Sequence, residues 1–523
     1  SGANSLHEAI ETVPGVYIKN YGGLGGMKTI SMRGSASSQT LVMLDGMPLN
    51  SAQNSSVDLS SYPLDLISSI EVAKGGAGAV FGGNALGGAI NLLSPQSKTD
   101  FAKVKLQAGS FGDRSIMLGG NYNLDNINLG ANCIYQSSDG DYPFASNQFG
   151  KKVELKRANG DFNNLALSGN FGISGDLSDF SVRAFARQSE RGVPGAVVQG
   201  HIESPANLDE KDALAIAKYS HVFGDDLIFH SLVAGRFNQM RYRDSTNPGG
   251  QTNGTDNTFI NKDIFFNSKL TKLIGKANAE LTFGANYSLL NGDMLDPSLK
   301  SKISRDGAWL GLRYESENWL KWTVAARADY LQTASPFYSA LAGVSREIIK
   351  NLNLRAFWSR NFRAPNFNEM YYLNYGNSKL KPEQSNSFNL GADAIIFGLV
   401  KVSTEGFYII TKDQIVSRPK SAVAWTASNI GLTRNYGAEL SASLSYEPIW
   451  LKTFSVGYTY QNPTNITENS AEHGKLITYM PQEIATATAV FEQFGINLGL
   501  IADYSSFRYA YADNTLRGVL PSH

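Results

Sequence analysis

The most constraining feature of this sequence is a strict alternation of apolar and polar residues that recurs along most of its length. Residues 103–108 read KVKLQA, residues 321–330 read KWTVAARADY, and residues 439–446 read ELSASLSY. A period of two is typical of β-strands, because successive side chains point to opposite faces of a sheet. The runs extend over about 9–11 residues, the length that a tilted strand needs to cross a bilayer. Strands of soluble domains are shorter, at about 5–6 residues.

Short and long connections alternate between these runs. Some are turns, such as residues 174–179 and 223–226. The others are long and polar: residues 137–161, 187–212, 242–261, 291–304, 361–386 and 461–481. This asymmetry characterises outer-membrane barrels. The alternative is a soluble propeller or β-helix, which the absence of a visible fixed repeat disfavours. Residues 99–523 therefore predict an antiparallel transmembrane β-barrel of about twenty strands.

The first 98 residues do not show these long alternating runs and predict a separate α+β unit. A short amphipathic helix is expected at residues 5–13, and short strands are expected at residues 30–33, 40–44 and 67–73. The glycine-rich residues 75–83 suit tight turns, since glycine tolerates positive φ and close backbone approach. A barrel of about twenty strands has a wide lumen, which such a unit could fill. We therefore predict a plug domain at residues 1–98 and a barrel at residues 99–523.

Composition excludes several other classes of protein. The 46 basic and 46 acidic residues are balanced, which disfavours nucleic-acid binding. The single cysteine, Cys133, excludes an internal disulfide framework and a multi-cysteine metal site. The six histidines show no close spacing, so a zinc site is unsupported. The longest apolar runs, such as residues 394–400, are far shorter than the ~18 residues of a membrane-spanning helix.

Seven motifs together resemble those of the TonB-dependent outer-membrane receptor family. The plug-type motifs are SLHEAIETVPGVYI from Ser5, ISMRG from Ile30, LVMLDGMPLN from Leu41 and IEVAKGGAGAVFGGNALGGAINLLS from Ile70. The barrel-type motifs are SRNFRAPNFNEMYY from Ser359, GNSKLKPEQSNSFNLG from Gly376 and NYGAEL from Asn435. They cover the chain in the family's order. The resemblance implies an all-β membrane protein: a barrel of about 22 strands in the family, filled by an N-terminal α+β plug, in the outer membrane of a Gram-negative bacterium.

The function that this resemblance implies is energised import. A scarce small-molecule ligand would bind from outside, and a TonB-type periplasmic energy-coupling protein would pull on the plug; outer-membrane lipids would surround the barrel. We expect a cobalamin-type corrinoid as the ligand, because the economical plug and loops most resemble the vitamin B12 receptors, with a ferric siderophore as the alternative. An outer-membrane lipase or protease is disfavoured, since no Gly-x-Ser-x-Gly element is present. A passive porin or adhesin leaves the plug motifs unexplained. No cofactor is expected to be required.

The ends of the chain and one motif depart from the family pattern. The family's energy-coupling box and first plug strand would precede Ser1, and its terminal barrel strands would follow His523. We therefore expect both domains to be truncated and the barrel to have exposed sheet edges. Lys74 is followed by two glycines where the family has an arginine–glycine–proline element; the charge is kept and the proline is not.

The resemblance also implies ion pairs between plug and barrel. The plug cations would be Arg33 and Lys74, and their partners on the barrel wall would be Glu383 and Glu439. Hydrated pairs of this kind are individually weak, so they could seat the plug and still break during transport. Their expected role is structural.

Ligand contacts are expected on two plug loops and one barrel loop. The plug loops are residues 20–27 and 50–62, whose neutral donors and acceptors suit a large polar ligand. The barrel loop carries tyrosines that suit either ligand contact or an interface girdle. The candidate ligand-binding residues are Tyr21, Leu24, Met27, Asn50, Ser51, Gln53, Asn54, Ser55, Tyr371, Tyr372 and Tyr375. By composition alone, the plug loops would be ordinary solvated loops.

Loop residues suggest two metal-dependent possibilities. Asp139, Asp141 and Asp161 could gather Ca²⁺ in an extracellular loop, because Ca²⁺ takes several oxygen ligands; solvated loop charges are the simpler interpretation. The cobalamin receptors of the family order their early loops with calcium. Haem receptors of the family place a histidine after the FRAP element at residues 362–365, and residues 366–379 contain none, which argues against haem ligation.

Overall fold

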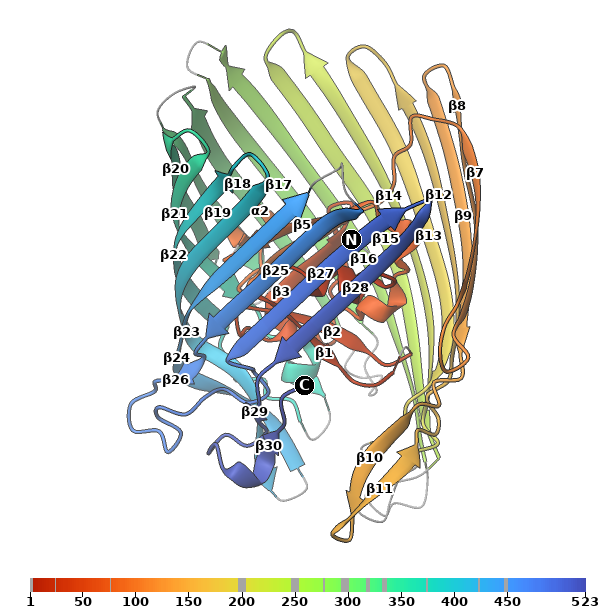
Figure 1. Cartoon of the computed structure of the whole chain (residues 1–523). Coiled ribbons are helices and arrows are strands. Elements are labelled where there is room, and N and C mark those ends of the chain that lie inside the picture. The colour runs from red at the N-terminus through yellow and green to blue at the C-terminus, as the bar shows by residue number, and fades with distance from the viewer. Residues whose placement is uncertain are drawn as a thin grey trace.

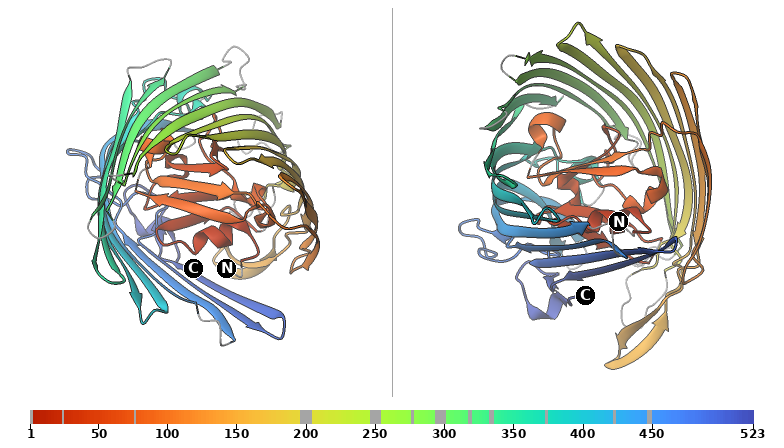
Figure 2. Two further views of the ribbon diagram at one scale, coloured as in Figure 1. Left: turned by 90° about the horizontal axis from the view of Figure 1, so that it is seen from above. Right: turned by 45° about the horizontal axis from the view of Figure 1, so that its top comes forward.

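A wide β-barrel surrounds the N-terminal domain of the protein (Figures 1 and 2). The structure, a computed structural model, describes residues 3–23, 25–75, 77–195, 204–245, 254–275, 278–292, 301–316, 320–331, 336–372, 375–421, 424–445 and 450–523. None of the described helices is long and apolar enough to span a membrane.

The barrel is built from antiparallel strands that pair in chain order. They are β7 (Phe101–Ala108), β8 (Arg114–Leu124), β9 (Ile127–Ser138), β12 (Phe162–Ser174), β13 (Ser178–Gly192), β14 (Asn207–Phe223), β15 (Leu227–Asp244), β16 (Thr255–Ile274), β17 (Ala279–Gly292), β18 (Ser301–Glu315), β19 (Lys321–Leu331), β20 (Phe337–Ile349), β21 (Leu352–Arg363), β22 (Glu383–Ile396), β23 (Val400–Ser421), β24 (Ala424–Ser445), β25 (Leu451–Gln461), β26 (Thr464–Asn465), β27 (Glu483–Gln493) and β28 (Ile496–Ser505).

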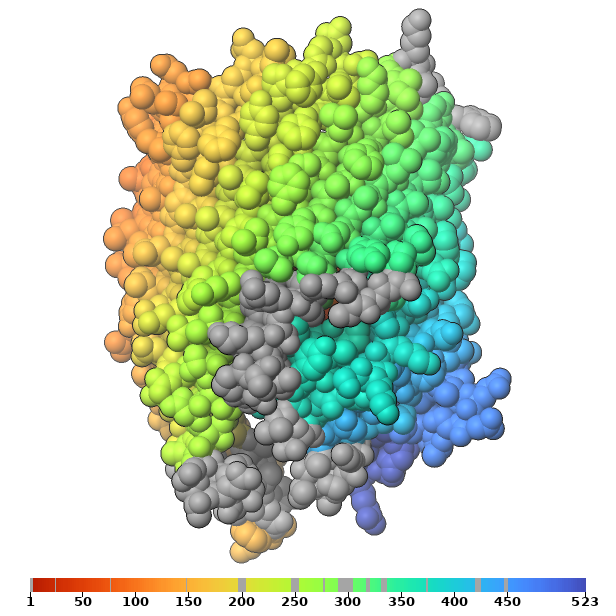
Figure 3. Space-filling model, turned by 180° about the vertical axis from the view of Figure 1, so that it is seen from behind, coloured from red at the N-terminus to blue at the C-terminus, as the bar shows by residue number. Residues whose placement is uncertain are grey.

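The alternation in the sequence places one set of side chains inside the barrel and the other outside. In β14, Glu210, Asp212 and Leu214 are buried inside, whereas Lys211 and Ala213 between them are exposed. Exposed large apolar side chains cover the outer wall, for example Leu106 at 74 % exposure and Leu390 at 66 %. Seen from behind, the coloured parts of the outer wall follow one another in chain order, from orange through green to teal (Figure 3). Such an apolar exterior around a polar interior is the pattern of a barrel in lipid.

Many strands are longer than the 9–11 residues that the sequence predicts. β13 has 15 residues, and β23 and β24 have 22 each. Residues 187–192 and 207–212, which the sequence assigns to a loop, belong to β13 and β14. The reason is that ladder pairing uses only backbone groups, so strands continue beyond the apolar band into polar sequence.

The strand order is that of a closed barrel, which differs from the expectation of two free sheet edges. The junction of β28 with β7 is nevertheless the least connected one between long strands. Long ladders join β7 to β8 and β27 to β28, whereas β28 and β7 are neighbours in the strand order without an extended ladder among the described residues. Both strands are also exposed along most of their residues. The inner wall at this junction is therefore less covered by the plug than it is at β14.

The N-terminal domain combines two small sheets and short helices. β1 (Val16–Asn20) pairs with β2 (Lys28–Met32), and a second sheet has the order β4 (Met47–Pro48), β3 (Thr40–Leu44), β6 (Gly88–Leu93), β5 (Ser69–Lys74). The helices are α1 (Leu6–Glu11), α2 (Gly78–Phe81) and the 3₁₀ turns η1 (Ser37–Gln39), η2 (Leu59–Ser61) and η3 (Leu64–Leu66). The last strand of this domain ends at Leu93 and the first barrel strand begins at Phe101, so the predicted boundary at residue 98 lies in the connection between them.

The plug contacts the barrel wall in two chemically different ways. Its apolar core, which includes Ile10 and Ile90, continues directly into wall residues Phe185, Leu214 and Ile216. Against β22, β23 and β24, by contrast, the contact consists of buried charged and polar groups. The plug is thus held by an apolar contact at β13 and β14, where Arg183 and Arg191 also pair with Asp45 and Asp58 of the plug, and by ion pairs at β23 and β24.

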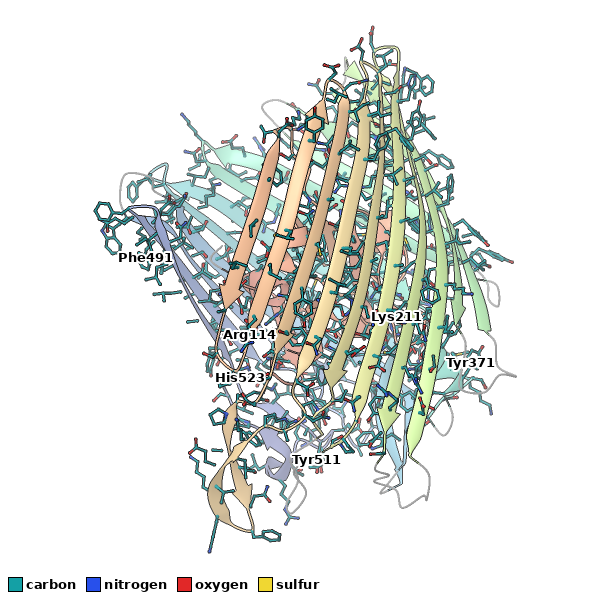
Figure 4. All side chains as sticks on the ribbon, turned by 90° about the vertical axis from the view of Figure 1, so that its right-hand side faces the viewer. Arg114, Lys211, Tyr371, Phe491, Tyr511 and His523 are labelled. Atoms are coloured by element: carbon teal, nitrogen blue, oxygen red, sulfur yellow. The ribbon has the colours of Figure 1, made fainter. Side chains whose placement is uncertain are left out.

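The long connections gather at one end of the barrel, toward the bottom of Figure 1. They carry the hairpin β10 (Pro143–Gln148) and β11 (Lys151–Lys156), the helix α3 (Phe367–Tyr371), and the segment after β28 with β29 (Arg508–Tyr509), η6 (Leu516–Gly518) and β30 (Val519–Leu520). Figure 4 shows the labelled Tyr371 and Tyr511 in the lower half of the molecule. The asymmetry of the connections therefore agrees with the sequence pattern.

Candidate ligand-binding site

A cavity of roughly 580 Å³ lies between the plug and the long connections of the barrel. The plug contributes the end of β1, Ala36 just before η1 and Ser38 within it. The barrel contributes α3, the β23–β24 hairpin, the connection between β25 and β27 and the segment after β28. Lining residues are Lys19, Ala36, Ser38, Glu369, Tyr375, Gln414, Ile415, Val416, Ser417, Arg418, Trp425, Ile430, Asn465, Glu472, Lys475, Leu476, Ile477, Thr478, Tyr479, Met480, Ala510, Tyr511, Ala512 and Asp513. This size and the mixture of aromatic and polar groups suit a small-molecule site.

Lys19 is the plug cation in this cavity, and alternation along β1 explains its position. Val16 and Ile18 point into the apolar core of the plug, so Tyr17 and Lys19 share the opposite face. The Lys19 ammonium lies 5.8 Å from the ring centre of Tyr479. Burial, followed by the nearby guanidinium of Arg508, lowers the pKa of Lys19 to about 8. The amine is thus a poorly hydrated cation beside a second cation.

Three carboxylates line the cavity, and two of them have cationic partners. The third, Asp513, forms no ion pair among the described residues, and its Oδ1 accepts from the Thr515 N–H at 3.1 Å. Glu472 accepts from Arg418 Nη2 at 2.7 Å, and Glu369 accepts from Arg363 at 3.0 Å. An Arg–carboxylate pair leaves little net charge on either group. The positive charge of Lys19 is therefore not balanced by these two acids.

A buried junction joins this cavity to the plug at Glu383, the first residue of β22. Gln39 Nε2 in the plug donates to both Glu383 oxygens, at 3.0 and 3.1 Å. The backbone N–H of Ile415, which lines the cavity, donates to Glu383 Oε1 at 2.6 Å. Arg363 bridges the Glu383 and Glu369 carboxylates. The prediction that Glu383 pairs with a plug cation is wrong: its ionic partner is Arg363 of the barrel, and its plug contact is the neutral amide of Gln39.

Arg33, Lys74 and Glu439 are brought together where the plug meets β23 and β24. Arg33 Nε and Lys74 Nζ each lie 2.7 Å from a Glu439 oxygen. Arg33 also contacts Glu405, and its Nη1 donates to Asn389 Oδ1 at 2.6 Å. The sequence reasoning missed Glu405 and Asn389. Both lie on strands in which polar and apolar residues alternate, and this period of two could have predicted that their side chains point into the barrel.

The Arg33 side chain is fully buried and packs against the ring of Phe407, with 4.8 Å between the guanidinium carbon and the ring centre. Arg33 itself has a positive φ of 48°. The adjacent Gly34 has φ +64°, and an added Cβ there would lie 2.8 Å from Asn435 Nδ2. The Arg-Gly pair therefore forms a tight turn that presses against the barrel wall.

The predicted ligand-contact role of the second plug loop fails for several of its residues, because they are buried. Asn50 accepts from the Val42 N–H and donates to the carbonyls of Thr40 and Ser55, so its amide holds the loop itself. Gln53 and Ser55 are each 1 % exposed. Ser51 accepts from the Gln53 N–H, and the exposed Asn54 accepts from the Ser56 N–H. Local side-chain hydrogen bonds of this kind shape turns, and they explain this composition without a ligand.

The barrel loop with the tyrosines covers this plug loop. The N–H groups of Phe367 and Asn368 donate to the carbonyls of Ala52 and Gln53, at 3.2 and 2.9 Å. Tyr371 packs against the cluster of Ala52 and Phe367. Tyr372 is half-buried. Of the three predicted tyrosines, Tyr375 lines the cavity, and its hydroxyl lies 2.7 Å from Ser417 Oγ.

The first plug loop, residues 20–27, is held by hydrogen bonds from one cation of the plug and one cation of the barrel. The buried Lys28 Nζ donates to the carbonyl of Gly23 at 2.8 Å and to Asn20 Oδ1 at 3.0 Å. Arg191 of the barrel donates to the carbonyl of Gly25 at 3.1 Å. The predicted contact residues Tyr21 and Met27 are exposed, and neither lines the cavity. Leu24 lies outside the described residues.

The predicted calcium ligands do not form a metal site. Among the described residues, no three His, Cys, Asp or Glu side chains gather in an arrangement that could hold a metal ion. Asp141 pairs with Lys156 at 2.5 Å, and Asp139 and Asp161 are exposed. Their side chains do not gather, although the backbones of Gly140 and Gly160 meet at the base of the β10–β11 hairpin.

Comparison with known protein families decides the class of this molecule. The model of the TonB-dependent receptor-like β-barrel matches residues 160–523, and the model of the TonB-dependent receptor plug domain matches residues 1–89. The chain belongs to the TonB-dependent receptor family. Members of this family are transporters of the Gram-negative outer membrane that bind TonB and small ligands, and this receptor is accordingly a transporter and not an enzyme.

The receptor is similar to curated relatives and to solved structures. It is 24 % identical to the "Vitamin B12 transporter BtuB" of Photobacterium profundum over 451 residues, which cover 85 % of this chain and 71 % of the relative. The BtuB of Vibrio vulnificus is also 24 % identical, over 83 % of this chain and 69 % of the relative. The ferric enterobactin receptor PfeA of Pseudomonas aeruginosa superposes with a TM-score of 0.77 at 17 % identity, covering 99 % of this chain and 87 % of that one. The copper transporter OprC gives a TM-score of 0.81 at 14 % identity, covering 100 % and 88 %. These solved structures show the fold alone.

The cavity residues that the sequence reasoning missed are mainly Lys19, Tyr479 and Trp425. A usable signal existed for Lys19, since it shares a strand face with Tyr17 and lies opposite the apolar Ile18. Tyr479 and Trp425 carried no local signal. They reach the cavity because the connection after β25 and the β23–β24 hairpin bend over the plug.

Proposed function

We propose that this receptor imports a cobalamin-type corrinoid through the cavity between plug and loops. The observation that carries the proposal is this cavity of roughly 580 Å³, which touches the plug at Lys19 and Ser38 and several loops of the barrel at once. A ligand bound there would contact both the plug, which would move during transport, and the barrel, which would stay fixed. Its size is within the range of about 300–1,000 Å³ that is usual for small-molecule sites.

The choice of a corrinoid is supported by the relatives and by the lining. The two vitamin B12 transporters match most of this chain. Aromatic faces at Tyr375, Trp425 and Tyr479 suit a large flat ring system, and Gln414 and Asn465 offer amides to the amide arms of a corrinoid.

A ferric siderophore is the second candidate, and the charge of Lys19 favours it. Lys19 lines the cavity, and the nearby guanidinium of Arg508 adds to its positive charge, which would attract the anionic oxygens of a ferric catecholate. A corrinoid has a single phosphodiester to place there. The two candidates therefore differ in how much negative charge the ligand brings.

A binding titration separates these candidates. The purified receptor is titrated with cyanocobalamin and with ferric enterobactin, and tryptophan fluorescence of the receptor is followed. We expect saturable cyanocobalamin binding at micromolar concentration or below, and weaker ferric enterobactin binding. Saturable binding of ferric enterobactin alone would replace the corrinoid with the siderophore. Binding of neither compound would refute both ligand proposals.

The cavity itself is tested by a variant. Trp425→Ala removes an aromatic side chain from its lining, and loss of a buried aromatic contact typically weakens binding tenfold or more. Trp450→Ala, an exposed tryptophan outside the lining, is the matched control and should bind as the unchanged receptor does. Equal binding by both variants would place the ligand site elsewhere.

A further inference from the structure

Lys19 is a partly buried cation without a carboxylate partner in the described residues. The ion pairs of the plug involve Arg33, Lys74, Asp45, Asp58 and Asp65, and Lys19 is in none of them. Most buried charges in proteins are paired. The Lys19 ammonium instead faces the ring of Tyr479 and opens onto the cavity.

The neighbour that acts on Lys19 is another cation. Arg508 Nη1 donates to Tyr17 Oη at 2.9 Å and to Ser505 Oγ at 2.7 Å, and both acceptors are neutral. Acidic groups do occur nearby: Asp503 of β28 and Glu11 of α1 act on the groups around Tyr17. Neither forms an ion pair with Lys19 or Arg508 among the described residues. Like charges held together in a partly desolvated place destabilise one another.

The backbone of Tyr479 is also strained where it meets Lys19. Tyr479 has φ +63°, a left-handed conformation that is unfavourable for a residue with a side chain. Its N–H donates to the Tyr509 carbonyl at 2.8 Å. This bond ties the Tyr479 loop to the β29 segment that carries Arg508, so both cations and the aromatic ring are fixed relative to one another.

We propose that Lys19 forms an anion-recognition corner of the cavity, reinforced by the nearby charge of Arg508, which takes a negatively charged oxygen group of the transported ligand. The group would be the phosphodiester of a corrinoid or the deprotonated catechol oxygens of a siderophore. An anion there would supply Lys19 with the ion-pair partner that it does not have among the described residues, and would accept hydrogen bonds from its ammonium. This inference rests on the proposed function, because it assumes that the cavity holds the ligand.

The test compares variants and probes that differ only in charge. Lys19→Met keeps the apolar stem of the side chain and removes the charge, and Lys19→Arg restores a charge. Lys151→Met on the exposed β10–β11 hairpin is the matched control. The probes are cyanocobalamin, dicyanocobinamide, which lacks the phosphodiester, and ferric enterobactin. Dissociation constants are measured by fluorescence titration. The probe that the wild-type receptor binds shows whether the anionic group is the phosphodiester of a corrinoid or the catechol oxygens of a siderophore.

We expect Lys19→Met to bind the charged probe at least tenfold more weakly, which corresponds to about 1.4 kcal/mol. Lys19→Arg should recover most of this loss, Lys151→Met should match the wild type, and dicyanocobinamide binding should be unchanged by Lys19→Met. Wild-type affinity of Lys19→Met for the charged probe overturns the proposal. An equal loss for the uncharged probe also overturns it, since it would indicate a general distortion of the cavity.

A ligand-independent measurement separates this inference from the proposed function. If the wild type binds none of the three probes, the proposed ligands are wrong. The anion corner is then judged by acetylation of Lys19 with sulfo-N-hydroxysuccinimide acetate, measured by mass spectrometry with and without inorganic pyrophosphate. Protection of Lys19 at least fivefold greater than that of Lys151 supports the anion corner, and equal protection overturns it.

Discussion

At the residue scale, Arg33 and Lys74 bind the same wall carboxylate from very different environments. The Arg33 side chain is 0 % exposed and that of Lys74 is 25 % exposed. Removing one member of a buried ion pair leaves an uncompensated charge, with a typical loss of about 3–5 kcal/mol. A partly exposed pair contributes about 1 kcal/mol or less.

We therefore expect Arg33→Met to lower the opening free energy of plug strands β2 and β3 by about 3 kcal/mol. Lys74→Met, the matched control at the same Glu439, should lower it by about 1 kcal/mol or less. Native-state hydrogen exchange of the receptor in detergent measures both values. Similar losses in the two variants would show that Arg33 does not carry the contact.

Glu11 of α1 is the plug residue with the clearest pH signature. Burial first, and then Asp503 and Glu8, raise the pKa of its carboxyl from 4.5 to about 7. A raised carboxyl pKa means that folding disfavours the charged form, so the loss of stability is absent below pH 4.5, grows between pH 4.5 and 7, and is complete above pH 7.

The variant Glu11→Gln removes this charge. We expect it to stabilise α1 and β1 at pH 8 by roughly 3 kcal/mol and to leave their stability at pH 4.5 unchanged. Hydrogen exchange at both pH values, corrected for the intrinsic rate, is the measurement. A gain of the same size at both pH values would mean that the charge of Glu11 is not the cause.

At the element scale, α3 connects the cavity with the plug. Its N-cap Asn366 and its residue Glu369 form a reciprocal capping box, and Arg363 ties Glu369 to Glu383, which receives the Gln39 amide of the plug. One short helix suffices for this role, because the side chains of Asn366 and Glu369 are buried and hydrogen-bonded. The helix thereby connects the barrel loop that covers plug residues 50–62 to the wall of the cavity.

Glu383→Gln should loosen this junction on both sides. The amide keeps the shape of the side chain and loses the ion pair with Arg363. We therefore expect the rate of amide hydrogen exchange to rise about tenfold both in α3 and in plug residues 50–56. Glu472→Gln, which breaks the half-exposed pair with Arg418, should leave the plug unchanged. A change confined to β22 would argue against coupling through α3.

At the scale of the whole molecule, the plug fills the barrel and contacts its wall through an apolar core at β13 and β14 and through ion pairs at β13, β23 and β24. Deletion of residues 1–98 should therefore turn a closed receptor into a leaky pore. Single-channel recordings in planar bilayers should show a large, steady conductance for the deletion variant and little for the intact chain. An unchanged ion permeability would contradict the assignment of this domain as the plug.

The sequence alone determined the architecture and the class of the receptor. Alternation with a period of two shows which residues face the interior of the barrel and which face outward, because successive side chains of a strand point to opposite faces. The motifs from Ser5 to Leu440 identify the family. Strand ends were predicted less well, as in β13 and β14, because backbone pairing does not depend on apolar sequence.

Only the tertiary structure decided which polar residues are available to a ligand. Asn50 and Gln53 look like ligand contacts in the sequence, yet the loop with α3 covers them, and Glu383 pairs with Arg363 rather than with a plug cation. Lys19 looks like an ordinary strand lysine, and becomes a cavity cation because the segments of Tyr479 and Arg508 meet it from more than 450 residues away. The physical reason is that burial and charge balance depend on groups distant in the chain, which a local pattern does not contain.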